Sequence, residues 1–156
     1  MNAYRQQPLR YPWPPMLFGI AIIAALLAHK LIGILPLGGG SWRSLAGLLL
    51  AAFAVAIDVW AAKTLIDSHT PVMHTSCAQR LVTTGPFRFS RNPIYLGYTL
   101  MTVALGLITG NAWFLITGLI AAAVTGLVAV RCEEMHLLAR FGIDFEQYCR
   151  QTRRWI

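Results

Sequence analysis

The chain has 156 residues, of which 56% are hydrophobic and only 12% charged, whereas soluble domains are roughly a quarter charged. Because so few polar side chains cannot cover a water-soluble globule, the composition predicts one integral membrane domain spanning residues 1–156. The formal net charge of +7 comes from cations that cluster at the ends of apolar runs, a pattern that favours membrane anchoring over nucleic-acid binding.

The first half of the chain predicts an N-terminal arm followed by a two-helix hairpin. Residues 1–15 are polar and rich in proline. Residues 16–37 and 42–66 are each apolar over enough length to cross the roughly 30 Å hydrocarbon core of a bilayer as a helix. A Gly-Gly-Gly-Ser turn at 38–41 separates them. We therefore expect the hairpin of residues 16–66 to hold two antiparallel helices side by side.

Two further apolar runs predict a second helical hairpin. Residues 94–109 form a run that is short for a membrane span, and residues 112–130 form a longer one after a tight turn at Gly110 and Asn111. Small residues on these runs let helix backbones approach closely. The glycines concerned are Gly97, Gly106, Gly118 and Gly126.

The helical pattern continues beyond the apolar part as far as Arg140. Phe141 and Gly142 are expected to end that helix, and a last short helix is predicted from Asp144 to Arg150. The predicted fold class is therefore all-α: a membrane bundle of about four transmembrane helices with a short C-terminal helix. Most arginines fall on the side that carries both termini, so the positive-inside rule places both termini in the cytoplasm.

One polar stretch interrupts the apolar sequence, QRLVTTGPFRFSRNPIYLG at 79–97. It contains two turn signals, Gly85-Pro86 and Asn92-Pro93. Asn92 is a favourable N-cap residue, and proline suits the first turn of the helix that follows. The stretch therefore predicts a shaped loop that carries Arg91 and leads into a hydrophobic helix, the kind of position in which binding residues often occur.

Glu133 and Glu134 are the only adjacent carboxylates, and they follow the last apolar run on the same predicted membrane face as the loop. A carboxylate can hold an amine or ribose hydroxyls, while Arg91 can hold a carboxylate or phosphate through two hydrogen bonds. The alternative is a helix that leaves the membrane, with its acids solvated or paired with Arg131 or Arg88.

Several common sites have no support in the sequence. There is no GxGxxG motif after a strand, no phosphate-binding P-loop, no HExxH and no GxSxG. The three cysteines are widely spaced and form no CxxC pair, so neither a disulfide framework nor a metal site is predicted. An all-helical membrane enzyme must then build a cofactor site from loops and helix ends.

Two segments together resemble a known group of enzymes. LVTTGPFRFSRNPIYLG and RCEEMHLLARFGIDFEQY are similar to the C-terminal core of the isoprenylcysteine carboxyl methyltransferase and phospholipid methyltransferase superfamily, over roughly residues 70–156. The resemblance implies S-adenosylmethionine-dependent methyl transfer, without a Rossmann fold, to a lipophilic carboxylate, thiol or amine. It also implies that residues 70–156 are the cofactor-binding core, with the cofactor site on the cytoplasmic face.

The resemblance implies specific site residues. Arg91, Asn92 and Glu133 are expected to be catalytic. The expected cofactor-binding residues are Gln79, Leu81, Val82, Gly85, Phe87, Asn92, Pro93, Tyr95, Glu133 and Glu134. Eukaryotic carboxyl methyltransferases have histidine at the positions of Gln79 and Asn92, and tyrosine at that of Phe87. Asn92 cannot act as a base near neutral pH, and the RNP variant is similar to the bacterial branch, so a bacterial inner membrane is expected.

Two alternative functions remain open from the sequence. The membrane sterol reductases are similar in their C-terminal helical core and use a nicotinamide cofactor. A non-catalytic membrane scaffold subunit could also retain the two segments for folding. The expected partners are a lipophilic small-molecule or lipid substrate and membrane lipids; the acceptor and the oligomeric state stay open.

Overall fold

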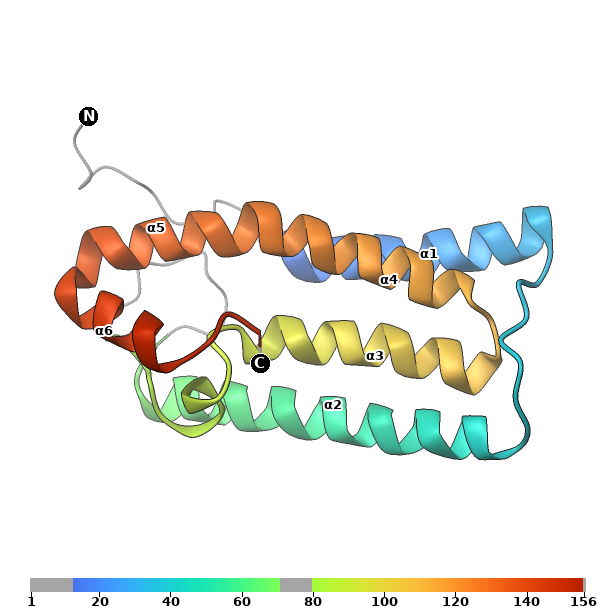
Figure 1. Cartoon of the computed structure of the whole chain (residues 1–156), viewed down its shortest axis with the longest axis horizontal. Coiled ribbons are helices and arrows are strands. Elements are labelled where there is room, and N and C mark those ends of the chain that lie inside the picture. Colours follow the sequence, from blue (N-terminus) through green and yellow to red (C-terminus); the bar gives the residue numbers. More distant parts are fainter. Residues whose placement is uncertain (1–12, 71–79, 156) are drawn as a thin grey trace. The chain divides into compact units, whose positions relative to one another are not determined.

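The computed structural model (Figure 1) describes residues 13–70 and 80–155, and these residues fall into two compact units. We call Trp13–Ala56 with Tyr95–Thr125 the hairpin unit. We call Ile57–Ile94 with Gly126–Ile156 the motif unit. Each is described by itself.

The described residues form helices and no strand, which confirms the all-α prediction. The predicted starts and ends of the second, third and last helices are within one residue of those observed. The elements are α1 (Trp13–Ile32), α2 (Trp42–Asp67), a 3-10 turn η2 (Gly85–Arg88), α3 (Pro93–Thr109), α4 (Trp113–Val124), a π-helical turn η3 (Thr125–Ala129), α5 (Val130–Phe141) and α6 (Ile143–Gln151).

The first helix ends earlier than expected. α1 stops at Ile32, whereas the sequence predicted a helix through Leu37. Gly33 adopts a φ of 105°, which lies outside the helical region and is accessible to glycine. The residues after it pair with the turn between α3 and α4: Ala112 N–H donates to Leu35 C=O at 2.8 Å, and Leu37 N–H donates to Gly110 C=O at 2.8 Å.

Within the hairpin unit, α1 packs against α4 (Figure 1). Phe18 and Ala21 of α1 and Ala121 of α4 form a buried cluster. The Phe18 ring also meets the ring of Tyr98 from α3, with centroids 5.7 Å apart. The residues after α1 bond to the turn before α4, so these two helices run antiparallel.

The predicted role of small residues in helix packing is confirmed for α3 and α4. A Cβ atom on Gly118 would lie 2.4 Å from Oγ1 of Thr102 on α3, and one on Gly106 would lie 3.1 Å from Cδ2 of Leu115 on α4. A side chain at Gly118 would overlap Thr102, and one at Gly106 would require Leu115 to shift by a few tenths of an ångström. These two glycines therefore let the backbones of α3 and α4 approach closely.

Within the part of the chain that the structure describes, three helical segments are long and apolar enough to cross a membrane: Trp13–Ile32, Trp42–Asp67 and Trp113–Phe141. The fourth apolar helix, Pro93–Thr109, has 17 residues. At 1.5 Å per residue its length is about 26 Å, slightly less than the hydrocarbon thickness of a typical bilayer.

Candidate functional site

The loop before α3, residues 81–92, folds around the turn η2 in the motif unit. Gly85 has a φ of 60°, a conformation that glycine adopts without strain. It also lies against α2, because a Cβ atom there would be 2.6 Å from Oγ1 of Thr64. The Phe89 ring lies beside the Trp60 ring of α2, with centroids 6.5 Å apart. The loop is thus held on the C-terminal part of α2.

The end of the loop is buried and hydrogen-bonded. Asn92 is 9% exposed, and its backbone N–H donates to the Ser90 hydroxyl at 3.2 Å. The Asn92 side-chain amide donates to the backbone carbonyl of Arg154 at 3.0 Å. Pro93 begins α3, as predicted. The N-cap role expected of Asn92 stays a prediction, whereas its contact with Arg154 was not expected.

The two sequence motifs meet through an ion pair. Arg91 Nη1 lies 3.0 Å from Oε1 of Glu134 on α5. A second arginine reaches the same carboxylate from the segment after α6: Arg154 Nε donates to Oε1 at 3.0 Å and Arg154 Nη2 to Oε2 at 2.5 Å. Two guanidinium groups therefore share one carboxylate. The hydrogen bonds that Arg154 donates to Glu134 raise the pKa of the Arg154 guanidinium above its usual value.

Cys149 of α6 lies next to this ion pair. Arg91 Nη1 donates to the Cys149 sulfur at 2.6 Å. Burial raises the pKa of the thiol above its ordinary value, although the Arg91 cation acts in the opposite direction. One residue earlier, the buried Tyr148 hydroxyl donates to the Phe87 carbonyl of the loop at 2.6 Å.

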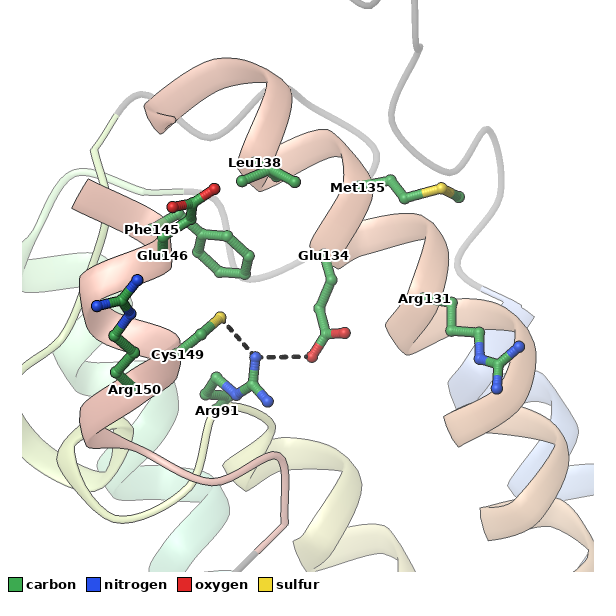
Figure 2. A pocket seen from close by; sticks show the side chains of 9 residues that line it. All are labelled: Arg91, Arg131, Glu134, Met135, Leu138, Phe145, Glu146, Cys149 and Arg150. Atoms are coloured by element: carbon green, nitrogen blue, oxygen red, sulfur yellow. Dashed lines mark hydrogen bonds and ion pairs between the residues drawn. The ribbon is translucent and has the colours of Figure 1, made fainter. Parts of the chain in front are cut away.

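A pocket of about 680 Å³ opens between α5, α6 and Arg91. Figure 2 shows Arg91 reaching between the two helices toward Glu134 on one and Cys149 on the other. The lining residues are Arg91, Arg131, Glu134, Met135, Leu138, Phe145, Glu146, Cys149 and Arg150. The volume lies in the range typical of small-molecule sites, and the lining combines cations, carboxylates and apolar groups.

The structure places two of the residues predicted for the site, Arg91 and Glu134, in this pocket. Glu133 is partly buried on α5 but does not line it. Tyr95 is 6% exposed and belongs to the hairpin unit, and Gln79 lies outside the described residues. The remaining predicted residues belong to the motif unit without lining the pocket: Leu81, Val82, Gly85, Phe87, Asn92 and Pro93.

Phe145, Cys149 and Arg154 were not predicted as site residues. Phe145 and Cys149 are four residues apart on α6, so they lie on one face of the helix. Phe145 and Tyr148 are buried, and their spacing in the sequence gives this helix a recognisable buried face. The role of Arg154 has no comparable local signal, because it depends on a contact with a distant helix.

Comparison with protein families gives a match that covers most of the chain. Residues 42–144 match the phospholipid methyltransferase family. The chain belongs to that family. No curated protein matches the chain. The family match includes Arg91 and Glu134 but ends before Cys149 and Arg154. Membership in a methyltransferase family, together with three helices long enough to cross a membrane, supports a membrane methyltransferase.

Proposed function

We propose that this family member transfers a methyl group from S-adenosylmethionine to a lipophilic acceptor at the membrane. The observation that carries the proposal is the ion pair between Arg91 and Glu134, which joins the two motifs at the wall of a ligand-sized pocket. A carboxylate, thiol or amine is the proposed acceptor.

The pocket chemistry fits the cofactor. S-adenosylmethionine carries a carboxylate, an ammonium, a sulfonium and an aromatic base, so its site needs charges of both signs and apolar surface. Among the described residues, Arg131 and Arg150 form no ion pair, so they are available to a carboxylate. Glu146 can hold an ammonium, and the Phe145 ring supplies apolar surface.

The proposal keeps the cofactor-binding residues that the resemblance implies in the loop, in the first turn of α3 and on α5: Leu81, Val82, Gly85, Phe87, Asn92, Pro93, Glu133 and Glu134. The proposed catalytic residues are Arg91 and Glu133. Because the Asn92 amide is bonded to a carbonyl, we assign it the positioning of the loop rather than proton transfer. Glu134 accepts from two guanidinium groups, so both of its carboxylate oxygens are engaged in these contacts.

The cofactor supplies an activated methyl group. The protein then has to align the acceptor with that methyl and keep water away, and alignment alone can contribute on the order of 7–11 kcal/mol. Arg91 supplies a fixed positive charge at the pocket wall, with its side chain only 15% exposed. An acceptor that is already deprotonated needs no base, whereas an ammonium acceptor has to lose a proton first.

For the membrane arrangement we propose four spans, with α3 as the shortest. Both termini and the pocket then lie on the cytoplasmic side of a bacterial inner membrane, because the arginines collect there. The acceptor is proposed to enter from the bilayer, while the cofactor enters from water.

The test is a methyl-transfer assay with the full chain in lipid nanodiscs and S-adenosylmethionine labelled in its methyl group. We expect label in the lipid fraction with the wild-type chain and with Arg88→Gln, and little with Arg91→Gln. Arg88 is a matched control because it is an exposed arginine on the same loop. No label with any chain, together with thermal stabilisation by NADPH and not by S-adenosylhomocysteine, would instead support a reductase.

A further inference from the structure

We infer that Arg154, which lies in the segment of residues 152–155 here called the strap, is a positioning residue that sets the Arg91 guanidinium at the pocket wall. The strap follows α6 and lies beyond the residues that match the family. The part of this inference that concerns ligand binding rests on the proposed function.

The strap is bonded to the loop before α3 at three successive points. The Thr152 hydroxyl donates to Arg88 C=O at 3.2 Å, and Arg91 N–H donates to Arg153 C=O at 3.0 Å. The third bond runs from the Asn92 amide to Arg154 C=O at 3.0 Å. Because the pairs follow the same order in both segments, the strap and the loop form one hydrogen-bonded unit.

The strap also contacts the helix that carries the acidic pair. The Arg154 side chain donates to both carboxylate oxygens of Glu134 on α5. A Cβ atom on Gly126 would lie 3.3 Å from Cζ2 of Trp155, so the Trp155 ring covers this glycine in η3. Arg154 is therefore joined to the loop through its backbone and to α5 through its side chain.

The shared carboxylate explains how Arg154 acts on Arg91. A guanidinium can bind both oxygens of a carboxylate, and Arg154 already occupies this arrangement on Glu134. Arg91 is left with one oxygen through Nη1, and the same nitrogen contacts Cys149. Without the Arg154 side chain, both oxygens of Glu134 become available to Arg91, which can then turn away from Cys149 and from the pocket.

The test compares Arg154→Gln with Arg153→Gln in the full chain. Both changes remove one cation from the strap, and both keep its backbone hydrogen bonds. Arg153 is exposed and contributes only its backbone carbonyl to these contacts. The two measurements are the Kd for S-adenosylhomocysteine and the pH profile of Cys149 alkylation by iodoacetamide, followed on its peptide by mass spectrometry.

We expect Arg154→Gln to weaken S-adenosylhomocysteine binding about tenfold, the effect of losing a charge-assisted contact, and to move the alkylation profile to higher pH. Arg153→Gln should leave both unchanged. If Arg154→Gln does not fold, Arg154→Lys takes its place, since a point charge cannot bind both oxygens in the same way. Equal values for the Arg154 and Arg153 variants in both measurements would overturn the inference. The wild-type chain could bind no S-adenosylhomocysteine while Arg154→Gln still moves the Cys149 alkylation profile to higher pH. That result would support the positioning role of Arg154 and contradict the proposed function.

Discussion

The guanidinium of Arg91 and the carboxylate of Glu134 lie 3.0 Å apart, and their side chains are only 15% and 18% exposed. This pair joins a loop to a helix that is distant in the sequence. Because both groups are largely removed from water, neither is well solvated without the other. Because Arg91 and Glu134 both line the pocket, loss of this ion pair should disturb the pocket wall.

Replacing Glu134 with Gln should destabilise the protein, because it leaves two guanidinium groups without their shared negative charge. We expect a loss of roughly 2–3 kcal/mol in the free energy of unfolding, less than for a fully buried pair because Arg154 is 39% exposed. Thermal unfolding in detergent measures the effect. Glu146→Gln is the matched control, since Glu146 is an exposed acid in the same pocket. Equal Tm values for the two variants would contradict the structural role of Glu134.

Gly85→Ala tests the packing of the loop on α2. Gly85 has a φ of 60°, and a Cβ atom added to it would be 2.6 Å from Thr64 Oγ1. Alanine there costs roughly 1 kcal/mol of strain and a further 1–3 kcal/mol or so of overpacking. Thermal unfolding should therefore show a clear loss of stability for Gly85→Ala and little change for Gly38→Ala, because nothing lies within 4 Å of a Cβ atom at Gly38. A loss at Gly85→Ala no larger than the roughly 1 kcal/mol of strain would show that the loop does not pack on α2 as described.

Gly118→Ala tests the close approach of α3 and α4. The new methyl group would meet Thr102 at 2.4 Å, so we expect a loss of about 1–3 kcal/mol in stability. Gly19→Ala in α1 is the control, because nothing lies within 4 Å of its Cβ position. Chemical unfolding of both variants in the same detergent gives the comparison, and a similar midpoint for the two would refute the close packing.

Tyr148 should make the protein sensitive to alkaline pH. Burial raises the pKa of its phenol above the ordinary value of 10.0. Above that value the phenol ionises in the unfolded chain but stays neutral in the folded one, so stability falls as the pH rises. Between about pH 8 and about pH 11, the wild-type Tm should fall more steeply than that of Tyr148→Phe. Parallel pH profiles would mean that the phenol is not buried as described.

Much of the fold could be predicted because each long helix is a continuous apolar run. α2 and α3 begin and end within one residue of their predicted limits, since glycine, proline and polar residues mark their ends. The predicted end of α1 was wrong, because the residues after Gly33 pair with a turn far along the chain. The π-helical turn η3 was not predicted either, since such turns have no simple hydrophobic period.

The site was predictable only in part. Arg91 and Glu134 could be found because each lies in a recognisable motif, and the structure confirms that these motifs meet. Arg154 has no such motif, and its importance depends on the path of the chain after α6. The roles proposed for Glu133 and Tyr95 stay predictions.

Calorimetric titration of S-adenosylhomocysteine into the detergent-solubilised full chain tests whether the chain binds the methyl-donor cofactor through Arg91. We expect saturable binding by the wild-type protein and by Arg88→Gln, and binding at least about tenfold weaker in Arg91→Gln, which loses a charge-assisted contact. No binding by a folded wild-type chain at about 1 mM ligand, where even a weak site would be half filled, would contradict this expectation.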